Sequence, residues 1–217
     1  MEFEVARRRM VDNQVRPNDV TSLEIINALG TVPREAFLPA KWRSQAYVER
    51  ELPISEGRTL ITARDFAKLL SAARPATTDI ALDVACGGGY SSAVLSRLVE
   101  MVVATEADEA ATNKAEATLE AAEVSNAAVV TGNPITAAGG QGPYDLILVA
   151  HVIEETPQAL LDQLKVGGRL ATILRSEGVS RGVTFVRTSD TFTQKYHFDA
   201  QARHVIPEFA RAPTFVF

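Results

Sequence analysis

The sequence predicts an α/β protein with a doubly wound, mostly parallel sheet, a helical cover at the N-terminus and antiparallel strands at the C-terminus. From residue 80 onward, short apolar stretches alternate with helical stretches, which is typical of βαβ units. A glycine-rich turn, Gly87-Gly88-Gly89, separates the first apolar stretch from its helix. We expect one domain over residues 1–217, with residues 1–55 as the cover and residues 56–217 as the core.

Short helices are expected within the first fifty residues. Thr21 is predicted to cap a helix, with Glu24 completing a capping box and Gly30 ending the helix. Residues 62–73 carry apolar side chains on one helical face, and Pro75 follows as a break. The N-terminal helices would form a cover on the sheet, and the helix over residues 62–73 comes before the first strand of its core.

The core follows in alternating strands and helices. Strands that are joined by helices run parallel, because the helix carries the chain back along the sheet. Residues 183–187 and 192–198 instead resemble an antiparallel pair, and residues 214–217 a last strand. The expected parallel strands are residues 80–84, 101–105, 127–131, 146–150 and 169–174, and the expected helices are residues 90–98, 108–122 and 157–164.

Composition excludes several classes of function. The formal net charge of −5 lacks the basic excess of a nucleic-acid binder, so we expect no nucleic-acid partner. The longest strongly apolar run, Leu146 to Val149, is far too short to span a bilayer, so we expect no membrane partner. Cys86 is the only cysteine and forms no intrachain disulfide, which suits a cytoplasmic location. The three histidines lack metal-ligand spacing, so no metal is expected.

The glycine turn suits a nucleotide-like ligand. Glycine lets the backbone approach a ligand closely, and the following helix directs free N–H groups at it. Glu106 ends the next strand, 23 residues after Asp83, where an acidic side chain would accept hydrogen bonds from ribose hydroxyls. Asp83 itself would attract the charged amino group of S-adenosylmethionine (SAM). This arrangement favours SAM as the cofactor.

A dinucleotide is the main competing ligand. Its fingerprint requires a third small residue where the helix meets the strand, and counting from Ala85 that position is Tyr90. A tyrosine there favours SAM over NAD, and a glycine turn without a ligand is the remaining alternative. Asn133 either faces the adenine or belongs to a plain Asn-Pro turn. The expected cofactor-binding residues are Asp83, Ala85, Cys86, Gly87, Gly89, Tyr90, Glu106, Ala107, Asn133 and Ala150.

These residues, together with several further segments, resemble the protein-L-isoaspartate O-methyltransferase family. The resemblance implies a Rossmann-like core of the class I SAM-dependent methyltransferases. It also implies methyl transfer from SAM to the side carboxylate of L-isoaspartyl residues in damaged proteins or peptides, leaving S-adenosyl-L-homocysteine (SAH). The segments that carry it are residues 10–11, 32–37, 57–60, 83–90, 144–149 and 164–170, with Glu106.

The chain departs from the family pattern near the reacting centre. The family has a serine and then a proline after the threonine that corresponds to Thr59, whereas this chain has Ile61 and Ala63 there. Since Ile61 cannot donate a hydrogen bond, Thr59 and Thr62 are the candidate catalytic residues that would border the acceptor. After the fourth strand the family has an Ala-Ala-Pro-Pro-like stretch, and residues 150–153 differ from it.

Two alternative functions follow from these departures. Ile61 is compatible with a non-catalytic protein that keeps the SAM pocket. His151, at the carboxyl end of a strand, could serve as general base in a methyltransferase of a small hydroxylated metabolite, or could be a loop histidine near solvent. Glu154 and Glu155 are expected to begin a helix. Cys86 is expected to be a small buried residue, although a helix start could lower its pKa.

Overall fold

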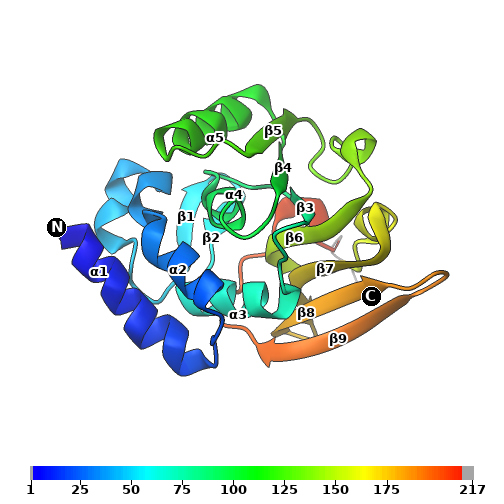
Figure 1. Ribbon diagram of the computed structural model, residues 1–217, viewed down its shortest axis with the longest axis horizontal. Coiled ribbons are helices and arrows are strands. Elements are labelled where there is room, and N and C mark those ends of the chain that lie inside the picture. Colours follow the sequence, from blue (N-terminus) through cyan, green and yellow to red (C-terminus); the bar gives the residue numbers. More distant parts are fainter. Residues whose placement is uncertain (1, 212–217) are drawn as a thin grey trace, which may run out of the picture.

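The computed structural model describes residues 2–211, which contain one large sheet. Its strands are β3 (Ile80–Asp83), β4 (Met101–Glu106), β5 (Ala127–Thr131), β6 (Tyr144–Ile153), β7 (Leu164–Ser176), β8 (Val179–Arg187) and β9 (Phe192–Asp199). They lie in the order β5-β4-β3-β6-β7-β8-β9 (Figure 1). Strands β3 to β7 pair in parallel, and β8 and β9 add an antiparallel edge. This confirms the predicted fold class.

Six α-helices, one π-helical turn and five short 3-10 helices accompany the strands in the described residues 2–211. The α-helices are α1 (Glu2–Met10), α2 (Leu23–Thr31), α3 (Ala63–Ala73), α4 (Tyr90–Leu95), α5 (Glu109–Ala121) and α6 (Gln158–Leu161). A π-helical turn, Val11–Val15, continues α1, and short 3-10 helices cover Arg16–Asn18, Arg34–Phe37, Ala40–Gln45, Gly139–Gln141 and Pro207–Phe209. In Figure 1, α1 and α2 lie together beside α3 and α4, on the side of the molecule away from the β8–β9 edge.

Two predicted helix starts are wrong. Ser22, not Thr21, caps α2, because the extended backbone of Ser22 lets its Oγ accept a hydrogen bond from the N–H of Ile25 at 3.3 Å. Glu154 and Glu155 do not begin a helix, since α6 starts only at Gln158. The two residues form a bend after β6, and the N–H of Glu154 donates to the carbonyl of Phe209 in the C-terminal segment. The last predicted strand, residues 214–217, lies outside the described residues.

A small hairpin between the cover and the core was not predicted. Strands β1 (Leu52–Ser55) and β2 (Arg58–Leu60) pair antiparallel, with Leu52 opposite Leu60. Alternating buried and exposed residues in β1 are the local signal for a strand. Gly57 has a φ of +67° and makes the tight turn possible. The expected boundary between residues 55 and 56 therefore falls inside this hairpin.

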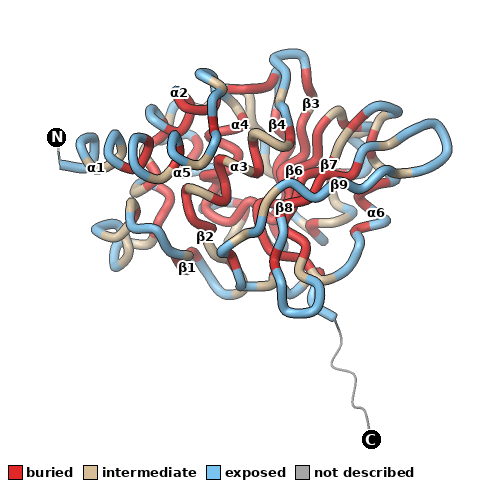
Figure 2. Tube along the Cα trace, turned by 90° about the horizontal axis from the view of Figure 1, so that it is seen from below, coloured by how far each residue is buried: buried red, intermediate tan, exposed pale blue. Residues whose placement is uncertain are grey.

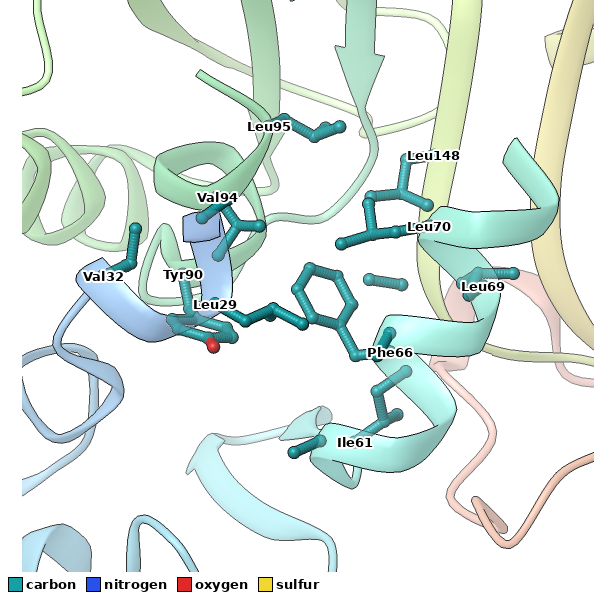
Figure 3. Close-up of a cluster of buried hydrophobic side chains, with 14 of the residues drawn as sticks. Leu29, Val32, Ile61, Phe66, Leu69, Leu70, Tyr90, Val94, Leu95 and Leu148 are labelled. Carbon is teal, nitrogen blue, oxygen red and sulfur yellow. The ribbon is translucent and has the colours of Figure 1, made fainter. Parts of the chain in front are cut away.

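The buried core joins the N-terminal helices to the sheet. One hydrophobic cluster contains side chains of α1, α2, α3 and α4 together with side chains of β3, β4, β6 and β7. Figure 2 shows that the buried chain concentrates along β3, β6 and β7, whereas α1 remains largely exposed. Figure 3 shows Ile61, Phe66 and Tyr90 within the cluster, close to Leu29 of α2. No helix within residues 2–211 is long and apolar enough to cross a membrane.

Candidate functional site

The candidate site lies where the strand order reverses. Strands β3 and β6 are neighbours, and the chain continues from β3 to β4 on one side and from β6 to β7 on the other. Open α/β sheets bind ligands at the carboxyl ends of the strands beside such a point. The glycine turn follows β3 here, Glu106 ends β4, and His151 lies near the end of β6. The topology therefore brings together three predicted parts of the site.

The turn after β3 has an unusual backbone. Ala85, Gly87 and Gly89 have φ angles of 57°, 62° and 87°, all in the left-handed region. Glycine adopts this region freely, whereas alanine at such an angle costs about 1 kcal/mol or more. Hydrogen bonds fix the turn: the N–H groups of Ala85 and Cys86 donate to the Oγ1 and carbonyl oxygen of Thr105. Strand β4 thus holds a strained backbone in place, as expected where the geometry serves a ligand.

Glu106 is fixed beside this turn. Its side chain is only 2% exposed. Its Oε1 accepts from the N–H of Gly87 at 2.6 Å, and its Oε2 accepts from the N–H of Ala107 at 3.0 Å. The carboxylate therefore lies at the glycine turn, where a ribose-binding residue would have to lie.

Arg58 and Glu208 complete the charged cluster, and neither is among the site residues that the sequence predicts. Arg58 of β2 donates from Nε and Nη2 to Glu106, at 3.3 and 3.5 Å. Its Nη2 and Nη1 donate to the two carboxylate oxygens of Glu208 at 2.6 and 3.0 Å. Burial opposes the charged form of Glu208, but the hydrogen bonds from Arg58 prevail and lower its pKa. No local signal could reveal the Arg58–Glu208 pair, because 150 positions separate the partners.

Asp83 is buried at the end of β3. Its Oδ2 accepts hydrogen bonds from the hydroxyl groups of Ser91 and Ser92, each at 2.6 Å. Its Oδ1 has no hydrogen-bond partner among the described residues. Burial raises the pKa of Asp83 to about 6, against the two serine hydrogen bonds that lower it. One buried acceptor atom beside the turn is therefore left for a ligand.

His151 is a buried residue of β6, so its interpretation as a loop histidine near solvent is wrong. Its Nε2 lies 2.8 Å from the carbonyl oxygen of Ala85. Burial lowers the pKa of His151 to about 4, so the ring is neutral at pH 7 and Nε2 carries the proton that this carbonyl accepts. Nδ1 is then an acceptor, and it has no partner within residues 2–211.

The three residues around the family serine position have different environments. Thr62 caps α3, where its Oγ1 accepts from the N–H of Asp65 at 3.0 Å. Ile61 is 1% exposed and lies in the hydrophobic cluster of Figure 3. The Oγ1 of Thr59 is buried and has no partner in the described part of the chain. Of the two candidate threonines, Thr59 therefore has the uncommitted hydroxyl group.

Tyr90 and Cys86 serve packing through their side chains. The ring of Tyr90 packs against Phe37 and Phe66, with centroid distances of 5.7 and 5.5 Å, and the guanidinium of Arg34 lies over it. These contacts fix the ring of Tyr90 in the hydrophobic cluster. Burial, and then the charge of Asp83, raise the pKa of Cys86 well above its ordinary value. The thiol is thus a small buried group whose pKa is raised, opposite to the lowering that a helix start would cause.

The remaining predicted residues flank the cluster. Asn133 is exposed, and its Oδ1 accepts from the N–H of Ile135 at 2.9 Å, which makes it part of a turn. Ala150 is buried one residue before His151, and Ala107 is exposed and meets Glu106 through its backbone. Within residues 2–211, no three His, Cys, Asp or Glu side chains gather closely enough to hold a metal ion.

Solved structures share this fold. A protein-L-isoaspartate O-methyltransferase superposes with a TM-score of 0.80 at 21% identity, over 94% of this chain and 67% of the other. A candidate protein-L-isoaspartate O-methyltransferase from Plasmodium falciparum, in complex with SAH, superposes with a TM-score of 0.78 at 16% identity, over 93% of this chain and 98% of the other. At these identities the likeness supports the fold alone.

Comparison of sequences finds relatives with higher identity than these solved structures. The family model for protein-L-isoaspartate(D-aspartate) O-methyltransferase matches residues 6–202. A protein-L-isoaspartate O-methyltransferase of Koribacter versatilis is 36% identical over 168 residues, which cover 77% of this chain and 76% of that protein. One from Roseiflexus castenholzii is 34% identical over 191 residues, covering 88% and 87%. The chain therefore belongs to the protein-L-isoaspartate(D-aspartate) O-methyltransferase family.

Proposed function

We propose that this protein is a SAM-dependent methyltransferase that esterifies the side carboxylate of L-isoaspartyl residues in damaged proteins or peptides. The observation that carries the proposal is the family match over residues 6–202, with relatives of the same name at 36% and 34% identity. SAM becomes SAH when its methyl group is transferred to the carboxylate. Family membership disfavours both a non-catalytic SAM-binding protein and a methyltransferase of a small metabolite.

The residues around the glycine turn fit SAM. Glu106 offers carboxylate oxygens for the ribose hydroxyls, and its own orientation is fixed by backbone N–H groups. Asp83 Oδ1 and His151 Nδ1 are buried acceptors without partners among the described residues, and the ammonium group of SAM is a donor that suits them. We assign cofactor contacts to these side chains and to the backbone of residues 85–90, with Ala107 and Ala150 at the rim.

The proposed reaction needs little from the side chains. Bound SAM supplies an electrophilic methyl group. An isoaspartyl carboxylate is ionised at neutral pH and attacks without a general base. The protein has to align this carboxylate and exclude water. Thr59 is the residue we assign to the acceptor, because its buried hydroxyl has no other partner in the described chain. Thr62 acts by capping α3, which follows the Thr59 segment directly.

An assay with a synthetic isoaspartyl peptide tests the proposal. The protein is incubated with methyl-labelled SAM and the peptide, and the base-labile methyl ester and SAH are measured together. We expect both products in equal amounts, and none with the peptide that has an ordinary aspartate at the same position. SAH release with a hydroxylated metabolite but not with the peptide would contradict the proposal. So would saturable binding of SAM without turnover on any acceptor.

We also infer a cytoplasmic location and one domain over residues 1–217. The only cysteine, Cys86, is buried and free, which suits a reducing compartment. The single domain is supported by the hydrophobic cluster that the N-terminal helices share with the sheet.

A further inference from the structure

The hydrogen-bonding capacity of Glu106 is already full. A carboxylate has about four lone-pair sites for hydrogen bonds. Two are taken by the N–H groups of Gly87 and Ala107, at 2.6 and 3.0 Å. The other two face Nε and Nη2 of Arg58, at 3.3 and 3.5 Å. Any ligand that binds this carboxylate through two hydroxyl groups must therefore replace two existing contacts.

The contacts from Arg58 are the ones that can be exchanged. The backbone donors belong to the glycine turn and to the residue after β4, so they cannot leave without unfolding the site. The Arg58 contacts are longer, and they come from the side chain of a short hairpin strand. A ribose has two neighbouring hydroxyl groups, which match the two positions that Nε and Nη2 hold on Glu106.

Glu208 can keep Arg58 paired after this exchange. A buried guanidinium that loses its only carboxylate would carry a large desolvation cost. Arg58 already donates to both oxygens of Glu208, at 2.6 and 3.0 Å, which are shorter contacts than those to Glu106. The charge of Arg58 therefore remains neutralised when Glu106 turns to the sugar.

The position of Glu208 does not depend on Arg58 alone. The N–H of Ile206 donates to the carbonyl of Val152 at 3.1 Å, and the carbonyl of Phe209 accepts from the N–H of Glu154 at 3.1 Å. Strand β6 and the residue that follows it, Glu154, thus anchor the two sides of the turn that carries Glu208. The hairpin meets the same turn, since a Cβ added to Gly57 would lie 3.0 Å from Pro207 Cγ.

Resting on the function proposed above, we propose that Arg58 holds the sugar-binding positions of Glu106 until the cofactor arrives, and that Glu208 then retains Arg58. Arg58 and Glu208 are thus positioning residues that set cofactor affinity. Binding replaces two long Arg58–Glu106 contacts with two hydroxyl contacts and breaks no contact between Arg58 and Glu208. If Glu208 loses its charge, Glu106 is the only carboxylate left to pair with Arg58 in this cluster. Arg58 then competes with the ribose of the cofactor for Glu106.

Calorimetric titration of SAH into the full-length protein tests this inference. We expect Glu208→Gln to weaken SAH binding about tenfold or more, the effect of one hydrogen-bonded charge. Arg58→Met should bind SAH at least as tightly as the wild type. Glu208→Gln should have no further effect in the Arg58→Met background, because the competing cation is gone. This non-additivity separates competition from a general loss of structure.

Glu35→Gln is the matched control. Its carboxylate also accepts from an arginine, Arg7, and its side chain is 13% exposed against 18% for Glu208. We expect unchanged SAH affinity for this variant, and the thermal midpoint of each variant identifies any that fails to fold. Wild-type affinity in Glu208→Gln, or an equal loss in both backgrounds, would overturn the inference while leaving the proposed function intact. If the wild type itself binds no SAH, the inference and the proposed function are both overturned.

Discussion

The imidazole of His151 donates from Nε2 to the carbonyl oxygen of Ala85 at 2.8 Å. This contact joins the end of β6 to the strained turn after β3. It also commits one ring nitrogen, while burial lowers the pKa of His151 to about 4. A general base is most effective when its pKa lies near the working pH. The contact between His151 and Ala85 therefore favours a role for His151 in holding the turn and contacting the cofactor, and not in proton transfer.

We expect His151→Ala to retain turnover on an isoaspartyl peptide within about tenfold of the wild type, because general base catalysis typically contributes about 10² to 10⁴ in rate. Initial rates of methyl ester formation at saturating SAM are the measurement. His197→Ala is the control, since His197 lies on β9 and bonds to Thr184. A drop of a thousandfold in the His151 variant alone would instead assign it a role in proton transfer.

Asp83 and His151 are expected to have opposite effects on stability between pH 4 and pH 6. The pKa of Asp83 is raised to about 6, so its contribution is largest in acid and is lost as the pH rises toward 6. The pKa of His151 is lowered to about 4, so its contribution is present above its unfolded value of 6.5 and is lost as the pH falls toward 4. In the wild type, the two contributions therefore change the free energy of unfolding in opposite directions as the pH changes.

Substituting one of the two residues should reveal how the other changes the free energy of unfolding with pH. Denaturant unfolding at several pH values between 4 and 7 is the measurement. Asp83→Asn should make the free energy of unfolding fall more steeply with acid, on the order of 1 kcal/mol per pH unit at most. His151→Gln should make it rise toward acid. Curves that stay parallel to that of the wild type would show that neither group titrates as its burial requires.

Thr59→Val should reduce turnover without reducing stability. Valine has nearly the shape of threonine, and the Oγ1 that it removes has no partner among residues 2–211. One lost hydrogen bond to an ionised acceptor corresponds to about tenfold or more in kcat/KM for the peptide. Thr59→Ser, which keeps the hydroxyl, is the control and should remain active. Equal rates for the valine variant and the wild type would remove Thr59 from the acceptor site.

Ile61→Ser should destabilise the protein, although it restores the family residue. Ile61 is buried in the hydrophobic cluster, so a serine there leaves a cavity and a buried hydroxyl. We expect a loss of about 2–4 kcal/mol in the free energy of unfolding, against about 1 kcal/mol for the control Ile61→Val. Urea unfolding measures both. A serine variant as stable as the wild type, with faster turnover, would place position 61 at the acceptor instead of in the core.

Local signals in the sequence were sufficient for the regular elements and for part of the site. The strand over residues 127–131 was predicted with the bounds of β5, and the helix predicted over residues 62–73 matches α3 with its cap, Thr62. Glu106 could be placed beside the glycine turn because parallel strands end at the same edge of the sheet. These features depend on periodicity, capping and topology, which neighbouring residues encode.

The remaining features depend on contacts between distant segments. Arg58 and Glu208 meet across 150 positions, and β6 runs past its predicted end while the C-terminal segment pairs beside it. The sequence predicts Gly88 as part of a ligand turn, and in the structure a Cβ there would lie 2.5 Å from the carbonyl oxygen of Phe37. Close packing of the N-terminal cover therefore also requires a glycine. None of these relationships leaves a periodic or local trace in the sequence.

The affinity of SAH for the wild type and for Glu106→Gln, measured by calorimetry, shows directly whether Glu106 holds the cofactor beside the glycine turn. We expect the wild type to bind one SAH per chain with saturation. We expect affinity at least about tenfold weaker in the variant, because a neutral amide loses the charge that strengthens hydrogen bonds from the ribose hydroxyls. Equal affinity of the two proteins, or no saturable binding by the wild type, would rule out this role of Glu106.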